Sequence, residues 1–253
     1  MRLTVLGRSA ACPNPGEACS GYLVEDGEVQ LVMDCGTGCV SRLRQLVDFR
    51  KVSAALISHM HFDHFADLIP YTYGLKLGTP LETGYRPQLY LPPGGREVFD
   101  EVVARWHDLR TFISDVFEVH EFDPHVTYRF GSLLVGFVPT KHYVPAWGIT
   151  VTGRDSKLAY SGDAGPSEEV ESLATNADLF LCEAALRVRT GAPKEFGHLT
   201  GREAGEIASR ASVKKLLLTH IWQEHDLRRM VAEARDAFLG PVEIAEEMKS
   251  YTV

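Results

Sequence analysis

The most constraining feature of this chain is a run of three histidines and one aspartate within six residues, His59-Met60-His61-Phe62-Asp63-His64. Imidazole nitrogens and carboxylate oxygens are the ligands that bind Zn²⁺-like cations at neutral pH. Four polar side chains on so short a segment would each need a partner if they were buried. A metal site therefore explains this density better than a solvated, histidine-rich turn.

The flanking residues predict where this run lies in a fold. The apolar run 52–57 predicts a buried strand, and the apolar spacing over 65–77 fits a helix. The histidine run is therefore expected on a loop at the carboxyl end of a strand, where layered α/β folds gather ligand sites. Alternate residues of such a loop can point to different sides, so His59 and His61 can serve one ion while Asp63 and His64 serve another.

The rest of the chain predicts short strands and helices in two similar halves. Predicted strands cover 2–7, 21–25, 29–33, 133–139, 147–152, 157–161, 178–182, 215–218 and 242–245. Predicted helices cover 40–47, 97–109, 200–210 and 226–239. This order predicts an α/β (α+β) fold in which two sheets pack face to face with helices outside, a four-layer αββα sandwich. We expect a single domain over 1–253, in which 73–123 is an insertion beside the site mouth that serves as a dimer surface or lid.

Four of the predicted strands end at a potential metal ligand. These ends are His59, His142, Asp163 and His220. Strand ends that share one edge converge in space even when they are far apart in sequence. The four residues are therefore expected to meet at one site.

Composition narrows the class of protein. The formal net charge is −8 and there is no run of Lys and Arg, which argues against strong nonspecific binding to nucleic acid, although a local basic patch would still allow RNA binding. No apolar stretch approaches the roughly 18 residues that a membrane span needs, and no signal peptide opens the chain. The five cysteines match no zinc spacing and are interpreted as reduced thiols. We expect a cytoplasmic protein without a membrane partner.

Taken together, these motifs resemble the metallo-β-lactamase superfamily, in its branch of ribonuclease Z-like enzymes and short bacterial cyclic-nucleotide phosphodiesterases. The resemblance covers essentially the whole chain. It rests on Asp34-x-Gly-x-Gly, His59-x-His61-x-Asp63-His64, His142, Ser161-Gly162-Asp163, Glu183, His198-x-Thr200 and His220.

The resemblance implies a site for two divalent cations, most simply Zn²⁺, although such ligands also accept Mn²⁺ or Fe²⁺. His59, His61 and His142 would bind one ion, Asp63, His64 and His220 the other, and Asp163 would bridge them. Two cations about 3.5–4 Å apart can hold a bridging hydroxide and neutralise the oxygens of a phosphodiester.

Two further residues are expected to act on the substrate's leaving group. His198 is the candidate proton donor, and Glu183 would orient it and favour its imidazolium form. Asp63 completes the predicted catalytic set. Asp34, Ser58 and Thr219 are expected to support the ligands by hydrogen bonds, while Tyr143, Trp147 and Trp222 could stack on a base but more simply pack at the core or rim.

The resemblance also separates the branches of the superfamily. Members that hydrolyse β-lactams usually carry Cys or Ser where Asp163 stands, and the pair Glu183 and His198 is not expected in glyoxalase-like thioesterases. Ribonuclease Z carries a long arm where this chain has only the twenty residues 143–162, and it more often has Gly at the position of Asp67.

Three functions stay open at this point. The departures favour a phosphodiesterase acting on small nucleotides, such as cyclic nucleotides. The alternatives are a ribonuclease acting on RNA or tRNA 3′ ends, and a metal-binding scaffold without catalysis. A homodimer is compatible with each of them.

Overall fold

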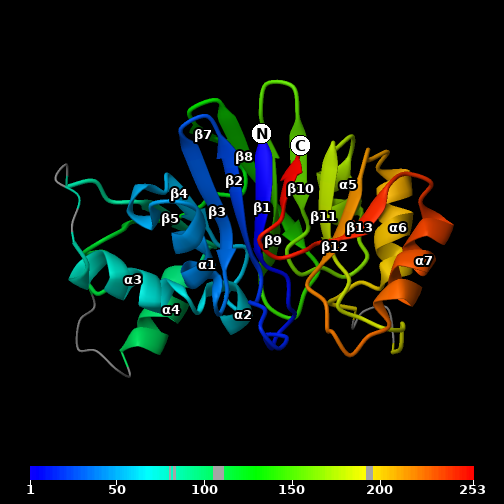
Figure 1. Cartoon of the computed structure of the whole chain (residues 1–253), viewed down its shortest axis with the longest axis horizontal. Coiled ribbons are helices and arrows are strands. Elements are labelled where there is room, and N and C mark those ends of the chain that lie inside the picture. Colours follow the sequence, from blue (N-terminus) through cyan, green and yellow to red (C-terminus); the bar gives the residue numbers. More distant parts are fainter. Residues whose placement is uncertain (80, 82–83, 105–110, 192–195) are drawn as a thin grey trace.

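The computed structural model describes residues 1–79, 81, 84–104, 111–191 and 196–253. Two seven-stranded sheets pack face to face, and helices cover the outer face of each (Figure 1). This arrangement confirms the four-layer αββα sandwich that the order of strands and helices predicts.

The first sheet has the strand order β14-β1-β2-β3-β4-β5-β6. Its strands are β1 (Arg2–Gly7), β2 (Gly21–Asp26), β3 (Val29–Cys35), β4 (Ala54–Leu56), β5 (Gln88–Leu91), β6 (Glu118–Glu121) and β14 (Ser250–Thr252). The pairs from β14 to β3 are antiparallel and those from β3 to β6 are parallel. The sheet therefore begins as a meander and continues through crossovers.

The second sheet repeats this pattern in the order β13-β12-β11-β10-β9-β8-β7. Its strands are β7 (Tyr128–Phe130), β8 (Leu133–Thr140), β9 (Ala146–Thr152), β10 (Lys157–Tyr160), β11 (Leu179–Glu183), β12 (Leu216–Thr219) and β13 (Val242–Ile244). The pairs from β7 to β10 are antiparallel and those from β10 to β13 are parallel.

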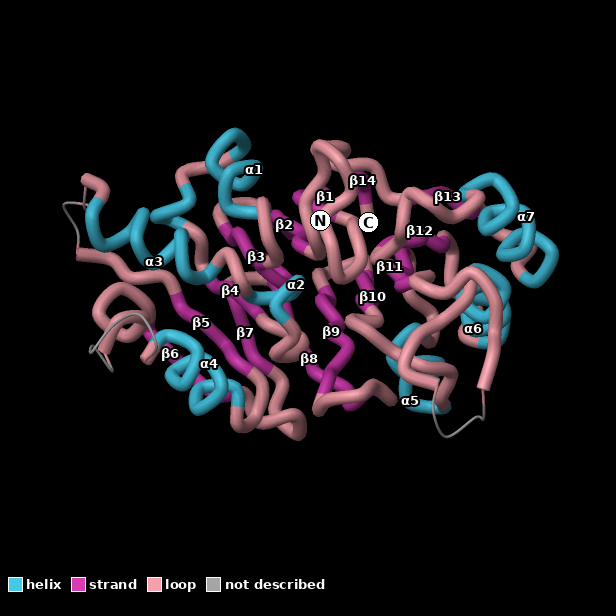
Figure 2. The backbone as a smooth tube through the Cα atoms, turned by 90° about the horizontal axis from the view of Figure 1, so that it is seen from below, coloured by secondary structure: helices cyan, strands magenta, loops and turns pink. Residues whose placement is uncertain are grey.

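The helices form the two outer layers. They are α1 (Cys39–Leu46), α2 (Phe62–Phe65), α3 (Leu68–Leu77), α4 (Gly95–Val103), α5 (Glu168–Ala174), α6 (Gly201–Arg210) and α7 (Leu227–Ala237), with a 3₁₀ turn at Phe49–Lys51. Figure 2 shows α1, α3 and α4 beside the first sheet, α5, α6 and α7 beside the second, and α2 between them. None of the helices in the described ranges is long and apolar enough to cross a bilayer.

Three apolar clusters hold the layers together. One lies between the sheets and includes Tyr22, Leu133 and Ile149, and one lies under the helices of each sheet. Strand β8 shows the expected alternation, because Leu133, Val135 and Phe137 face the inner core while the residues between them are less buried. Strands β11 and β12 are buried along their whole length, as their continuous apolar sequences predict.

The helix expected over 65–77 begins three residues later, as α3, and the separate turn of α2 precedes it. Pro70 lacks the N–H that a continuous helix would donate to the carbonyl of Ala66. The Asp67 side chain instead accepts a 2.8 Å hydrogen bond from the N–H of Val40, at the start of α1. Residue 67 thus supplies the cap that Gly38, at the N-cap of α1, has no side chain to provide.

Segment 73–123 supplies β5, β6 and α4 to the first half of the molecule. Its helix was expected to run to residue 109, and the part over 105–109 lies outside the described residues. The location of this segment beside the site mouth and its role as a dimer surface or lid stay predictions. All five cysteines lie in the described ranges and are free thiols.

Candidate metal centre

The strand ends that the sequence singled out meet at one edge of the two sheets. His59 follows β4 of the first sheet, whereas His142, Asp163 and His220 follow β8, β10 and β12 of the second. One correction concerns the histidine run, which was expected entirely on a loop. Asp63 and His64 instead lie in the single turn of α2, with His61 at its N-cap, and the ring centroid of His64 lies 4.1 Å from that of His59.

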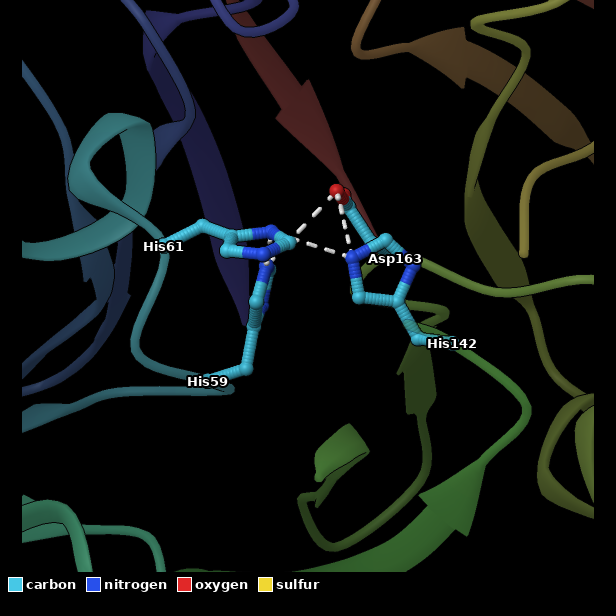
Figure 3. A group of neighbouring side chains, drawn as sticks. All are labelled: His59, His61, His142 and Asp163. Carbon is cyan, nitrogen blue, oxygen red and sulfur yellow. Dashed lines mark hydrogen bonds and ion pairs between the residues drawn. The ribbon is translucent and has the colours of Figure 1, made fainter. Parts of the chain in front are cut away.

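The first group of side chains consists of His59, His61, His142 and Asp163 (Figure 3). Nδ1 of His61 lies 3.2 Å from Nε2 of His59 and 3.1 Å from Nε2 of His142. Oδ2 of Asp163 lies 3.7 Å from each of those two Nε2 atoms. Four potential ligand atoms therefore converge on one point.

The second group consists of Asp63, His64, Asp163 and His220. Nε2 of His64 lies 3.3 Å from Oδ2 of Asp63 and 3.2 Å from Oδ1 of Asp163. Nε2 of His220 lies 3.3 Å from Oδ2 of Asp163. Asp163 belongs to both groups, so its carboxylate joins them into one continuous cluster.

The spacing and the hydrogen bonding of these atoms fit divalent cations. Ligand atoms around a tetrahedral ion with bonds of about 2.0–2.2 Å lie about 3.3–3.6 Å apart, close to the separations in both groups. Oδ2 of Asp63, Nε2 of His64 and Oδ1 of Asp163 are buried and have no hydrogen-bond partner among the described residues. Buried polar atoms without partners are costly, and a cation would satisfy all three.

The buried carboxylate of Asp34 orients ligands of both groups. Its Oδ2 accepts hydrogen bonds from Nδ1 of His64 at 2.7 Å, from the hydroxyl of Ser58 at 2.8 Å and from the hydroxyl of Tyr160 at 2.7 Å. The Ser58 oxygen in turn lies 3.0 Å from Nδ1 of His59 and accepts from it. Both imidazoles are thereby fixed with Nε2 toward the site.

Two other ligands are oriented by residues that the sequence did not single out. Nδ1 of His142 donates to the carbonyl of Gly197 at 2.7 Å, and Nδ1 of His220 lies 2.9 Å from the hydroxyl of Ser20. Of the predicted supporting residues, Ser58 contacts a ligand, whereas the Thr219 hydroxyl bonds to Tyr22. Ser20 and Tyr160 are ordinary residue types outside the quoted motifs, although Tyr160 directly precedes Ser161-Gly162-Asp163, and only their places at strand ends could have marked them.

The backbone also departs from ordinary conformations at the site. Asp34 has φ 55° and His220 has φ 52°, in the left-handed region that few non-glycine residues occupy. A Cβ at Gly36 would collide with the carbonyl oxygen of Asp63, so the Gly-rich turn that follows Asp34 packs directly against the histidine run. The site is thus built by a close approach of two segments that only glycine permits at that point.

Burial and mutual charge set the protonation of the ligands. Burial lowers the pKa values of His59, His61 and His142, which keeps these imidazoles neutral and able to bind a cation. Burial opposes ionisation of Asp163, but the imidazoles of His220 and His64 outweigh it and lower the pKa of the carboxyl well below its usual range. Burial likewise opposes the charged form of His64, but the carboxylates of Asp163 and Asp63 raise its pKa; a divalent cation would supply the same positive charge.

Glu183 and His198 form a hydrogen-bonded pair at the edge of the groups. Oε1 of Glu183 accepts from Nδ1 of His198 at 2.9 Å and from the N–H of Ala164 at 2.7 Å. Burial lowers the pKa of His198, but the charge of Glu183 outweighs it and raises the pKa to about 9. His198 precedes Thr200, which caps α6 and forms a capping box with Glu203.

The remaining aromatic candidates occupy different environments. Trp147 is buried and packs against Phe122 in the inner core, which agrees with the expectation that it packs at the core or rim. Tyr143 instead lies beside His142 and His198, with ring centroids 5.0 and 5.5 Å away.

Known proteins share this fold over nearly the whole chain. Residues 30–221 match the model of the Beta-lactamase superfamily domain. The crystal structure of the metallo-beta-lactamase fold protein YhfI from Bacillus subtilis superposes with a TM-score of 0.86 at 27% identity, covering 99% of this chain and 98% of that one.

Sequence relatives point to the same family. The protein Rv1339 of Mycobacterium tuberculosis is 32% identical over 96% of this chain and 88% of its own length. A ribonuclease Z of Mycobacterium bovis is 26% identical over 98% of this chain and 96% of its own. With the matched domain, the fold and the cluster of histidines and aspartates in agreement, the chain belongs to the metallo-hydrolases of the beta-lactamase superfamily.

Proposed function

We propose that this protein is a hydrolase of small phosphodiesters, most simply cyclic nucleotides, that uses two divalent cations. The observation that carries the proposal is the convergence of seven His and Asp side chains into two groups sharing Asp163, next to a hydrogen-bonded Glu–His pair. In this proposal His59, His61 and His142 hold one cation, Asp63, His64 and His220 the other, and Asp163 both. Zn²⁺ suits these nitrogen and oxygen ligands, as do Mn²⁺ and Fe²⁺.

The chemistry divides between the cations and the side chains. Divalent cations, when bound, make water nucleophilic at neutral pH and offset the negative charge of a phosphodiester. Asp63 would contribute an anionic ligand from α2. No serine or cysteine nucleophile is required, because the attacking group is water.

His198 is proposed to protonate the departing oxygen. Its Nδ1–H donates to Glu183, so the other ring nitrogen is the one that can reach a substrate. Glu183 accepts four hydrogen bonds in all, from Nδ1 of His198 and from the N–H groups of Ala164, Ala185 and Leu199, which fixes the carboxylate in place. A rigid carboxylate that keeps the imidazolium charged is what a general acid for a poor leaving group needs.

A small substrate is favoured over tRNA by the shape of segment 143–162. Strands β9 and β10 occupy most of this segment, and their connections are short, so no arm extends from it to hold a large RNA. The relatives named ribonuclease Z keep RNA 3′ ends as the second candidate substrate. The cytoplasmic location and the homodimer stay predictions.

A substrate panel tests the proposal. Purified protein loaded with Zn²⁺ or Mn²⁺ is assayed on bis(p-nitrophenyl) phosphate, 3′,5′-cyclic nucleotides, 2′,3′-cyclic nucleotides and an unprocessed tRNA, with metal content measured in parallel. We expect two metals per chain and the highest kcat/KM on a cyclic nucleotide. Cleavage of the tRNA alone would favour the ribonuclease, and two metals with no hydrolysis of any diester would favour the scaffold. Protein that retains no transition metal would exclude all three.

A further inference from the structure

The loop after β8 places an exposed aromatic ring beside the proposed proton donor. Tyr143 follows His142 directly and is 63% exposed. Exposed aromatic rings beside a site are common where a ligand covers them. The position of this ring therefore bears on what the site binds.

The loop that carries Tyr143 is anchored on two sides. The N–H of Gly165 donates to the carbonyl of Lys141 at 2.6 Å, and Nδ1 of His142 donates to the carbonyl of Gly197 at 2.7 Å. The ring itself lies against Gly197, where a Cβ would come within 2.6 Å of its Cζ atom. Since one side of the ring is supported in this way, the exposed side is a preorganised flat surface.

The ring lies on the side of the site from which the leaving group departs. Its centroid is 5.5 Å from that of His198, the proposed proton donor, and 5.0 Å from that of His142. An aromatic group joined to the departing oxygen through one sugar would therefore come close to Tyr143. When a 3′,5′-phosphodiester is cleaved at the 3′-oxygen, the nucleoside that carries that oxygen brings its base to this side.

Resting on the phosphodiesterase activity proposed above, we propose that Tyr143 is a stacking surface for the base of the nucleotide whose 3′-oxygen departs. The substrate class is thereby narrowed to diesters that carry a nucleobase on the leaving side. Base–aromatic stacking tolerates different bases, so the preference concerns the presence of a base more than its identity.

The test compares substrates with and without a base. Adenosine 3′,5′-cyclic phosphate and the 3′,5′-cyclic phosphate of 1-O-methylribose share the reacting group and the sugar. We expect Tyr143→Ala to lower the ratio of their kcat/KM values by about 5- to 150-fold, the range that loss of one base stack gives. Tyr143→Phe and Tyr143→Trp should retain the ratio, and Tyr143→Leu should lose it. Leu239→Ala, which removes a fully exposed side chain outside the site, serves as the matched control.

A binding measurement separates this inference from the activity on which it rests. Adenosine 5′-monophosphate and ribose 5-phosphate are titrated calorimetrically into the metal-loaded wild type and Tyr143→Ala. Tighter binding of the nucleotide by the wild type, lost in Tyr143→Ala, supports stacking even if no diester is hydrolysed. An unchanged preference for the nucleotide in Tyr143→Ala would overturn the proposal. In the kinetic test, equal losses of kcat/KM on the substrates with and without a base would show that the ring only supports His142. Loss of bound metal in Tyr143→Ala would show the same, and either result would overturn the proposal.

Discussion

Three of the histidines at the candidate metal centre donate a hydrogen bond through the ring nitrogen that faces away from the other side chains of their group. The acceptors are Ser58 for His59, Asp34 for His64 and the carbonyl of Gly197 for His142. Each bond fixes one tautomer and leaves Nε2 free as a ligand. Hydrogen-bond partners likewise define the proposed roles of His198, Glu183 and Asp34. Three substitutions test these roles.

The first concerns His198 as proton donor. We expect His198→Ala to keep both metals and to lower kcat by about 10²–10⁴-fold on cyclic nucleotides, whose leaving alkoxides need a proton. Activated p-nitrophenyl diesters, whose leaving group needs little help, should lose much less. His120→Ala, at an exposed histidine stacked on Tyr90, is the control. Equal losses on both kinds of diester would remove His198 from this role.

The second substitution, Glu183→Gln, tests how the rate depends on pH. A donor acts while it is protonated, so the rate should fall as pH rises through the pKa of His198. Glu183 raises that pKa to about 9, and bound cations would shift the alkaline limb to a lower pH. In Glu183→Gln the limb should move further toward acid, as a pH profile of kcat would show. A limb at the same pH in both proteins would contradict the pairing.

The third concerns Asp34, which accepts three hydrogen bonds on one oxygen. Asn offers only one acceptor oxygen and turns an amide N–H₂ toward a donor in either orientation. Asp34→Asn should therefore weaken metal binding by about 10–100-fold, measured by competition with a chelator. Asp155→Asn, at an exposed position, should bind metal as the wild type does. Unchanged affinity in Asp34→Asn would show that the ligands hold their orientation without it.

At the scale of elements, the strands that the sequence predicts well are the buried ones. β1, β8 and β12 were expected to within a residue or two at each end, because their apolar runs stop at turn or ligand residues. β6 was not predicted, because the residues of its sequence Glu-Val-His-Glu are largely exposed and show no apolar pattern. β14 has one buried residue, Tyr251, and depends on pairing with β1 from the other end of the chain.

The candidate site was predictable for a related reason. The seven side chains that converge in the two groups belong to dense or strand-terminal motifs, so the sequence singled out all of them, and their role as metal ligands stays a prediction. Ser20 and Tyr160 could not be found in this way, since their importance depends on which strand ends become neighbours. Helix α5 was not predicted, although its sequence contains a helix-start pattern. Ser167 caps the helix, and Glu168 and Glu169 occupy its first turn.

One element depends on a cap from another. We expect Asp67→Ala to lower the free energy of unfolding by about 0.5–2 kcal/mol, because the N–H of Val40 loses its acceptor at the start of α1. Asp67→Asn retains an acceptor and should lose less. Denaturant unfolding measures both, and metal affinity should stay unchanged. A stability equal to that of the wild type in Asp67→Ala would mean that water replaces the carboxylate.

At the scale of the whole molecule, the two groups of histidine and aspartate side chains connect the two sheets. The first half of the chain contributes the histidine run, and the second contributes His142, Asp163 and His220. A cation bound by side chains from both halves would stabilise their packing, since the unfolded chain does not bring these groups together.

Metal removal should therefore lower Tm. At a free metal concentration of about 100 times Kd, binding contributes about 2.7 kcal/mol to stability. For a chain of this size that corresponds to roughly 5–10 °C. Calorimetry with and without EDTA measures the shift, and Asp163→Ala, which lacks the carboxylate shared by both groups, should show little of it. An identical Tm in EDTA would argue against a metal that joins the halves.

The hydrogen bonds that cross between the sheets also restrict how such a protein can evolve. Ser20 of the first half orients His220 of the second, Tyr160 of the second bonds to Asp34 of the first, and β14 completes the sheet begun by β1. A chimera that takes its two halves from different relatives would inherit each orienting residue without the partner it evolved with. Recombination within this family should therefore succeed only between parents that agree at these contacts, however similar their ligand motifs are.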